Sequence, residues 1–458
     1  MFSKNDKIDK PKVDLNSNRS PVLPTGTGKM SSGIISSQLA KLIIQFVSIL
    51  VLSRLFSPKD FGVVAIATVG TLLLELVRDR GLTNILISRS KMGASEIYFI
   101  GRHQAVIASV GWILLSCFGF VLALNPDFRS AEMGFLLIGA IPVISSLQMP
   151  SLVQLSIEKK FFSQNIADIL GYLVGFACAF ISAINGFGVI SLFLQPLITS
   201  FVSGIVRFIA KPWRIFGPIS LEAIRELNSD GRYYLASNSV VLLASNSDSL
   251  SLAANSTSIF LGAYNRFFQI SVGAAGQVLT SLGFLVLSQF REAKNEGKTV
   301  RPIVDFYTYR IGIPAAAIVG CAIPFNASFV QLALGEQWVP YSTIFTILSV
   351  GALLQIHTYI AYWLSLTVLS SSEIFRLNLK TRIPAALMIA AASLLSAGAV
   401  AMAYSLGQFF IWIETVRVIG GKQRVAFAQL SKSGFAVLGI CIACFLFALF
   451  ISNLKVVV

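Results

Sequence analysis

The chain has 458 residues, of which 55% are hydrophobic and only 12% charged, and its mean hydropathy is +0.75. Soluble domains carry about 25% charged residues, so this composition excludes a soluble protein of this length and predicts an integral membrane protein. We interpret the formal net charge of +15 as an excess of Lys and Arg in cytoplasmic loops. It does not indicate a nucleic-acid partner.

The predicted elements begin with a polar tail, residues 1–30, which is rich in Lys, Asp, Asn, Ser and Pro. Such a tail cannot bury enough apolar surface to fold, and we expect it to be disordered. No cleavable signal peptide is found, so the first apolar segment should act as the uncleaved membrane signal. A spanning helix needs about 20 mostly apolar residues. On that rule the sequence predicts thirteen spans, within an acceptable range of 12 to 14: 34–54, 61–77, 103–124, 133–155, 166–183, 189–209, 235–254, 259–287, 306–325, 341–368, 384–399, 402–419 and 434–452.

Lys and Arg are distributed unevenly between the two predicted sides. With the N-terminal tail placed inside, 29 of the 36 Lys and Arg residues lie in the tail or in inside loops such as 371–382, whereas four lie outside and three within spans. This asymmetry predicts a cytoplasmic N-terminus. The outside connections are short, and one of them, Glu336-Gln337-Trp338, is predicted to be an interfacial turn with a Trp anchor.

The chain repeats itself at an offset of 200 residues, and Gly62 aligns with Gly262 at the start of a span. In the preceding spans three polar residues of each half align, namely Gln38, Gln45 and Ser48 with Asn238, Ser245 and Asp248. We therefore predict an all-α polytopic membrane protein, a two-lobe bundle of 12–14 transmembrane helices with a pseudo-two-fold repeat. The predicted parts are a cytoplasmic tail (1–30), an N-lobe of six helices (31–210), a cytoplasmic linker (211–232), a C-lobe of about six helices (233–430) and an additional C-terminal helix (431–458).

Ionisable residues inside the spans are the candidate functional residues, because a charge in the bilayer is costly unless it is paired or faces water. Asp248 shares a polar helical face with Asn238 and Ser245. This face favours the wall of a hydrated cavity, with a helix–helix interface as the alternative. Two roles are open to Arg266 in the next span: an ion pair with Asp248, or the binding of an anionic substrate group.

Lys41 and Gln45 lie on the polar face of the first span. Lys41 is predicted either to meet a phosphate or acidic sugar, or to snorkel to the inner interface. His357 lies well inside its span and would be able to titrate with a coupling proton, although a hydrogen-bonded structural histidine is the more common case. The predicted substrate-cavity residues are Lys41, Gln45, Asn238, Ser245 and Arg266, and the predicted ion-coupling residues are Asp248 and His357.

Motifs for catalysis and cofactor binding are not found in the sequence. With only two histidines, His103 and His357, no His-rich metal site is expected. The tail sequence PTGTGKM lacks the spacing of a P-loop, so ATP-driven transport by this chain alone is not expected. We therefore expect neither enzyme activity nor a metal or other cofactor.

Five segments follow one another in a distinctive order and spacing: LSRLFSPKDFGVVAIA (52–67), RGLTNILISR (80–89), PSLVQLSIEKKFFSQ (150–164), FLGAYNRF (260–267) and LGEQWVP (334–340). In these segments the chain resembles the polysaccharide flippases of the Wzx type, over about residues 30–370. Those flippases belong to the MATE/MOP exporter superfamily, which also holds the MATE drug exporters and the lipid II flippases.

The resemblance implies two six-helix lobes around a central cavity that opens alternately to the two sides of the bacterial inner membrane. It implies an undecaprenyl-pyrophosphate-linked oligosaccharide as substrate, flipped to the outer leaflet for lipopolysaccharide or exopolysaccharide synthesis. The partners expected from it are membrane lipids and the polysaccharide polymerase and chain-length machinery, not nucleic acid. Within this scheme we predict ion-coupled alternating access.

Two alternatives stay open. A MATE-type multidrug or cation antiporter would share the fold, although basic residues within the spans argue mildly against a cationic substrate. A membrane glycan polymerase or ligase would belong to another class, and it would need large external loops, which are short here.

Overall fold

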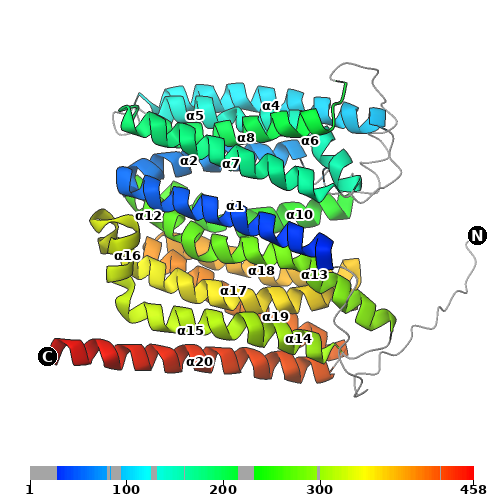
Figure 1. Cartoon of the computed structure of the whole chain (residues 1–458), viewed down its shortest axis with the longest axis vertical. Coiled ribbons are helices and arrows are strands. Elements are labelled where there is room, and N and C mark those ends of the chain that lie inside the picture. The colour runs from blue at the N-terminus through cyan, green and yellow to red at the C-terminus, as the bar shows by residue number, and fades with distance from the viewer. Residues whose placement is uncertain are drawn as a thin grey trace, which may run out of the picture.

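The computed structural model describes residues 28–79, 83, 94–124, 131–158, 160–214, 232–296, 300–422 and 424–457. Within these residues the chain is helical and contains no strand, and its long helices run roughly alongside one another (Figure 1). Helices suit such a chain because the bilayer core offers no water to backbone N–H and C=O groups, which must pair within the segment. The predicted tail and the predicted linker fall largely outside the described residues.

The first lobe comes from the first half of the chain and occupies one side of the bundle in Figure 1. Its helices are α1 (Gly28–Leu55), α2 (Pro58–Asp79), α4 (Ala94–Leu122), α5 (Ala131–Gly139), α6 (Ile141–Ile157), α7 (Phe161–Ile184) and α8 (Ile190–Ala210). Helices α5 and α6 follow each other across Ala140 and together account for one predicted span.

The second lobe occupies the other side, and several of its spans are stacks of short helices. Its elements are α10 (Arg232–Ser245), α11 (Ser247–Asn255), α12 (Ser258–Phe268), η2 (Gln269–Gly273), α13 (Ala274–Asn295), α14 (Arg301–Tyr307), η3 (Thr308–Gly312), α15 (Ile313–Ala322), η4 (Ile323–Phe325), α16 (Asn326–Leu334), η5 (Glu336–Tyr341), α17 (Ser342–Val368), α18 (Ser371–Ser393), α19 (Ala397–Lys422) and α20 (Arg424–Val457).

Twelve of the thirteen predicted spans each correspond to one helix or to one stack of consecutive helices, whereas the predicted span 384–399 covers the second half of α18 and the first residues of α19. The uncertain region 384–419 divides as the weak turn Ser396-Ala397-Gly398 predicts, because α18 ends at Ser393 and α19 begins at Ala397. Among the described residues, nine helical segments are long and apolar enough to cross a membrane. The all-α, two-lobe fold class is confirmed, whereas the exact lobe boundaries stay predictions.

The predicted inside loop 371–382 is wrong, because these residues form the first half of α18. A capping box starts the helix: the Ser370 backbone N–H and hydroxyl both donate to the Glu373 carboxylate at 2.8 Å. The charges that suggested a loop are accommodated on the helix. Lys380, for example, pairs with Glu414 of α19 at 2.8 Å.

The two lobes touch where α2 crosses α12 in direct backbone contact. A Cβ atom at Gly62 would lie 1.8 Å from the Ser258 carbonyl oxygen, and one at Gly262 would lie 1.9 Å from the Pro58 carbonyl oxygen. These are equivalent contacts, because each pair of equivalent positions differs by 200. The repeat in sequence is therefore also a repeat in space, with a pseudo-two-fold axis at this crossing.

A second contact between the lobes involves η5, and it corrects the expectation for Trp338. This side chain is fully buried rather than interfacial, and its indole N–H donates to the Ser53 carbonyl at 2.8 Å. The Gln337 amide donates to the carbonyls of Ser53 and Phe56, both at 3.0 Å. Carbonyls at a helix C-terminus lack intrahelical partners, so η5 caps the end of α1 from the opposite lobe.

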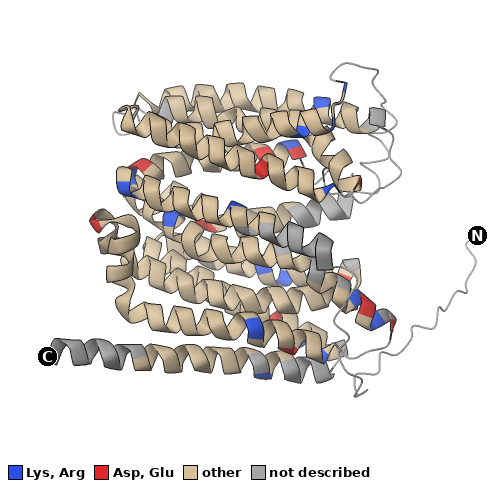
Figure 2. Cartoon of the chain, in the orientation of Figure 1, with Lys and Arg blue, Asp and Glu red and all other residues tan. Residues whose placement is uncertain are grey.

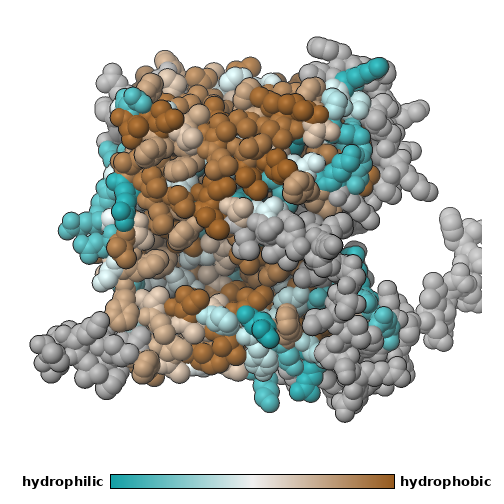
Figure 3. All heavy atoms as spheres, in the orientation of Figure 1, coloured by the Kyte–Doolittle hydropathy of each residue, from teal (hydrophilic) through white to brown (hydrophobic). Residues whose placement is uncertain are grey.

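The outer surface agrees with a membrane setting. Figure 3 shows a broad apolar area over the middle of the helices, with hydrophilic residues toward the two ends of the bundle. Most Lys and Arg residues drawn in Figure 2 lie toward the end at which α1 begins. The protein is therefore a multi-pass membrane protein, and a cytoplasmic location of that end stays a prediction.

Candidate functional site

An inter-lobe cavity lies where α11 and α12 of the second lobe face α2 of the first. Its volume is about 230 Å³. The α2 side is mostly apolar and includes Phe61, whereas the second lobe contributes the polar and charged lining residues Ser245, Asn246, Asp248, Ser249, Asn265, Arg266 and Gln269. Three predicted site residues, Ser245, Asp248 and Arg266, are thus brought together at one cavity.

The polar stretch around Asp248 breaks its span into α10 and α11 at Asn246. Asn246 leaves helical geometry, with φ −120° and ψ 13°, and its side-chain amide donates to the Leu242 carbonyl at 2.8 Å. Short polar side chains compete with the helix for such backbone groups. The break puts Asp248 in the first turn of α11, where the helix dipole stabilises a negative charge.

Asp248 is held by neutral hydrogen-bond donors. Its side chain is 3% exposed. One carboxylate oxygen accepts from the Tyr264 hydroxyl at 2.8 Å, and the other accepts from the Ser249 backbone N–H at 2.7 Å. Among the described residues, no cationic side chain pairs with Asp248. A negative charge on Asp248 must therefore be balanced by solvent, by an ion or by a ligand in the cavity.

Arg266 is also buried and without a carboxylate partner in the described part of the chain. Its guanidinium carbon lies 3.6 Å from the centroid of the Phe61 ring of the first lobe, and Nη1 donates to Gln269 at 3.0 Å. The Nε atom is buried without a hydrogen-bond partner. No ion pair joins Arg266 to Asp248 in the structure, and the binding of an anionic group by Arg266 stays a prediction.

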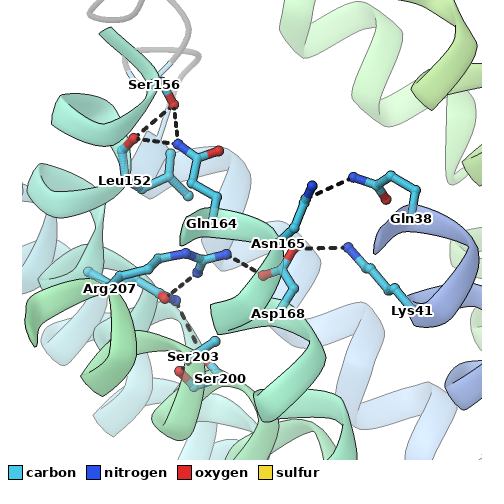
Figure 4. A network of polar contacts seen from close by, with 11 residues as sticks. Gln38, Lys41, Leu152, Ser156, Gln164, Asn165, Asp168, Ser200, Ser203 and Arg207 are labelled. Carbon is cyan, nitrogen blue, oxygen red and sulfur yellow. Dashed lines mark hydrogen bonds and ion pairs between the residues drawn. The ribbon is translucent and has the colours of Figure 1, made fainter. Parts of the chain in front are cut away.

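Lys41 does not line the inter-lobe cavity and lies in a polar network within the first lobe (Figure 4). Its ammonium pairs with Asp168 of α7 at 3.1 Å and lies 5.4 Å from the Tyr172 ring centroid. Arg207 of α8 binds the same carboxylate. Lys41 is thus occupied by an acidic side chain, and this pair would have to open before Lys41 met an anionic substrate.

The same network holds α1 to α7 at a second point one turn earlier. The Gln38 amide donates to Asn165 at 3.1 Å (Figure 4), and Asn165 donates to Ser37 at 2.6 Å. Gln45 lies further along α1, does not line the inter-lobe cavity, and has a buried side-chain oxygen without a partner among the described residues. The polar side chains of the first span therefore make contacts within the first lobe, whereas those of the equivalent span in the second lobe line the inter-lobe cavity.

Of the remaining two predicted residues, His357 does not line this cavity. His357 is buried in α17, where Nδ1 lies 3.0 Å from the Leu353 carbonyl and the ring contacts Trp412 edge-on. Its Nε2 has no partner among the described residues. Asn238 lies in α10, but its side chain is outside what the structure describes.

A larger cavity of about 420 Å³, here named the C-lobe chamber, lies inside the second lobe between α10, α13, α17, α18 and α19. It meets the inter-lobe cavity at the helix break, since Ser245, Asn246 and Phe268 line both. Sequence reasoning missed Arg382 in its wall because the residue was assigned to a loop. Asn378 and Arg382 are four residues apart, a spacing that places both on one face of a helix, and this spacing could have indicated that the segment is helical.

Metal-ligating side chains do not gather anywhere in the described part of the chain: no three His, Cys, Asp or Glu residues are close enough to hold an ion. The site is therefore built from isolated charges, amides, hydroxyls and aromatic rings.

Comparison with known proteins identifies the family. The family described as polysaccharide biosynthesis protein matches residues 51–343, which is well over half of the chain. The chain belongs to this family. The match spans α2, α12 and η5, so it includes the glycine crossing and the contact of η5 with the end of α1.

Curated relatives carry related descriptions. The chain is 24% identical over 328 residues to an "uncharacterized membrane protein in cps region" of Klebsiella pneumoniae, covering 66% of this chain and 63% of that protein. It is 25% identical over 343 residues to the lipopolysaccharide biosynthesis protein WzxC of Escherichia coli K12, covering 71% and 68%. A shorter match, 26% over 167 residues, joins it to the succinoglycan biosynthesis transport protein ExoT of Rhizobium meliloti, covering 36% and 32%. The chain thus spans about two-thirds of the length of the first two relatives.

Solved structures show the same fold. The lipid II flippase MurJ, in an inward closed conformation, matches with a TM-score of 0.72 at 12% identity, covering 93% of this chain and 99% of MurJ. An outward-facing multidrug resistance MATE transporter of the MOP superfamily matches with a TM-score of 0.52 at 13% identity, covering 88% and 96%. At these identities the likeness shows the two-lobe transporter fold.

Proposed function

We propose that this protein flips a lipid-linked oligosaccharide precursor of a surface polysaccharide, carried on undecaprenyl pyrophosphate, to the outer leaflet of the bacterial inner membrane. Membership of the polysaccharide biosynthesis protein family supports the class of substrate. The MurJ-like fold supports transport between two lobes. In this proposal the N-terminus is cytoplasmic, no covalent bond is made or broken, and the lipid tail stays in the bilayer.

One observation carries the proposal: a buried arginine, which has no acidic partner among the described residues, lines the cavity between the lobes. Arg266 has an unpaired Nε and lies against Phe61 of the opposite lobe. A guanidinium offers five donors in a planar fork, which suits the oxygens of a phosphate. We assign Arg266 to the pyrophosphate, with Ser245 as a neighbouring hydroxyl in the same wall.

Coupling to an ion gradient is the second part of the proposal. Asp248 lies in the same cavity wall as Arg266 and has no cationic partner among the described residues. Binding of a proton or a sodium ion there would remove its charge and change the balance between the two lobe arrangements. His357, which has a free ring nitrogen, stays a candidate for proton coupling elsewhere in the second lobe.

The two alternatives have less support. In the inter-lobe cavity a cationic drug would meet Asp248 as well as Arg266, so it is the family match that favours a glycan precursor. A polymerase or ligase would need a group that activates a sugar. Among the described lining residues of the two cavities the only carboxylate is Asp248, and the described chain holds no metal cluster beside it.

The test is a flipping assay with the full chain in liposomes. The vesicles contain a fluorescent undecaprenyl-pyrophosphate oligosaccharide, and a membrane-impermeant quencher is added outside. Protein-containing vesicles should lose the inner-leaflet signal with time, whereas protein-free vesicles should keep it. Equal protection in both samples would overturn the proposal. A fluorescent cationic drug serves as the second substrate, and its selective transport would support the exporter alternative.

A further inference from the structure

The C-lobe chamber has the chemistry of a sugar-binding pocket. Its volume of about 420 Å³ lies within the usual range of roughly 300–1,000 Å³ for small-molecule sites. Its lining combines aromatic faces with hydrogen-bonding side chains, among them Tyr359, Tyr362, Tyr404, Gln408 and Asn378. No carboxylate lines the chamber within the described residues, so its only lining charge is positive.

One lining residue presents an unused acceptor. Gln355 of α17 is more than nine-tenths buried, and its Oε1 atom has no hydrogen-bond partner among the described residues. A buried acceptor without a donor costs about 1–3 kcal/mol, and native proteins seldom leave one unpaired. Sugar hydroxyls are donors of the right kind, so the orphan acceptor points to a hydroxyl-bearing ligand in the chamber.

The positive charge is Arg382 of α18. Its Nε donates to the Asn378 side chain at 3.3 Å and its Nη1 donates to Ser245 at 3.4 Å. These two long contacts leave three of its five N–H donors unused, and no acid pairs with it in the described chain. An arginine with free donors in a planar fork matches a carboxylate, which it binds through two parallel hydrogen bonds.

We propose that the C-lobe chamber binds one sugar unit of the oligosaccharide and that this unit carries a carboxylate, as a uronic acid does. Arg382 takes the carboxylate, Gln355 accepts from a ring hydroxyl, and the tyrosines cover the ring faces. The inference rests on the proposed function for the source of the sugar. It adds a site that selects the glycan, separate from Arg266 in the inter-lobe cavity.

The position of the chamber allows both groups of one ligand to be held together. The chamber and the inter-lobe cavity share Ser245, Asn246 and Phe268 at the helix break. A pyrophosphate at Arg266 and a sugar at Arg382 would therefore lie on the two sides of one wall. Arg382 itself contacts Ser245 at that wall. The pyrophosphate and the selected sugar of one ligand would therefore bind at adjoining sites.

The experiment measures binding of two soluble probes to the full chain in nanodiscs by saturation-transfer NMR. One probe is a tetrasaccharide with a single glucuronic acid, and the other has glucose at that position. The wild type should prefer the acidic probe. Arg382→Gln should bind the acidic probe roughly 10- to 100-fold more weakly and leave the neutral probe unchanged. The matched control is Arg376→Gln, an exposed arginine on the same helix that does not line the chamber, which should keep the preference.

A second variant tests the site without changing its charge. Gln355→Met keeps the side-chain volume and removes the orphan acceptor, so both probes should bind about three- to tenfold more weakly while the thermal midpoint does not fall. Equal affinity of the wild type for the two probes, or an unchanged preference in a folded Arg382→Gln protein, overturns the inference. So does loss of acidic-probe binding on adding inorganic pyrophosphate, which would assign Arg382 to that group. Flipping by a wild type that fails these tests would leave the proposed function standing.

Discussion

At the scale of single residues, Asp248 combines burial with the lack of a cationic partner in the described chain. Its hydrogen bonds to Tyr264 and Ser249 fix the carboxylate without neutralising it. We expect Asp248→Asn to lower transport roughly 5- to 150-fold, the range of typical coupling free energies of about 1–3 kcal/mol. The amide oxygen can accept from the Ser249 N–H while the amide NH2 donates to the Tyr264 hydroxyl, so the amount of folded protein should stay the same. The flipping assay, with an ion gradient imposed, measures the effect.

The control for this prediction is Tyr264→Phe, which removes the hydroxyl and keeps the ring. If the charge of Asp248 matters, Tyr264→Phe should keep transport dependent on the ion gradient. Gradient-dependent transport at the wild-type rate by Asp248→Asn would show that this residue has no coupling role.

The sequence predicts the positions of some polar residues but not the contacts that others make. Composition and helical spacing sufficed to find Asp248 and Arg266, because a charge inside a span is rare enough to stand out. They did not reveal that Lys41 is neutralised by Asp168, since that contact joins residues 127 positions apart. Arg382 was missed for a related reason: charges in the first turns of a span resemble a loop until the packing is known.

At the scale of elements, the crossing of α2 and α12 determines how closely the lobes approach. Gly62→Ala would place a methyl group 1.8 Å from the Ser258 carbonyl oxygen, so the two helices must move apart. Overpacking of this kind costs about 1–3 kcal/mol. We therefore expect the contact to open more often. A cysteine placed at Ser249, in the inter-lobe cavity, should then react faster with a membrane-impermeant maleimide.

The matched control for the crossing is Gly439→Ala in α20, where an added Cβ meets nothing within 4 Å. This variant should leave the reaction of the cavity cysteine unchanged. An equal rate in Gly62→Ala and the parent protein would mean that the crossing does not limit access to the cavity.

The elements themselves were largely predictable from the sequence. Apolar length located the spans, because a bilayer of fixed thickness demands it, and the offset of 200 residues anticipated the symmetric crossing of Gly62 and Gly262. The break at Asn246 and the stacked helices of the second lobe were not predicted. Apolar length does not distinguish one long helix from two short ones when side chains replace a few backbone hydrogen bonds.

At the scale of the whole molecule, the contacts between the lobes include the glycine crossing, the cap that η5 places on α1, and the packing of Arg266 on Phe61. Within each lobe, by contrast, polar networks such as that of Asp168 join neighbouring helices. This division predicts that the lobes move as units during transport. Rigid-body motion of two domains about an interface is a common form of such transitions.

Joining the lobes covalently should therefore stop transport. We propose cysteines at Ser53 and Gln337, whose backbone carbonyl and side-chain amide lie 3.0 Å apart, in a background without the five native cysteines. Linking them with a short bifunctional methanethiosulfonate, which forms a disulfide with each cysteine and releases sulfinate, should abolish flipping. Reduction should restore it, because alternating access requires the η5–α1 contact to open. The control pair, Asn326 and Thr346, lies within the second lobe and is joined by a 2.5 Å hydrogen bond. Linking that pair should leave flipping intact. Flipping at the full rate by a protein linked between Ser53 and Gln337 would exclude separation of the lobes at this end as a step in transport.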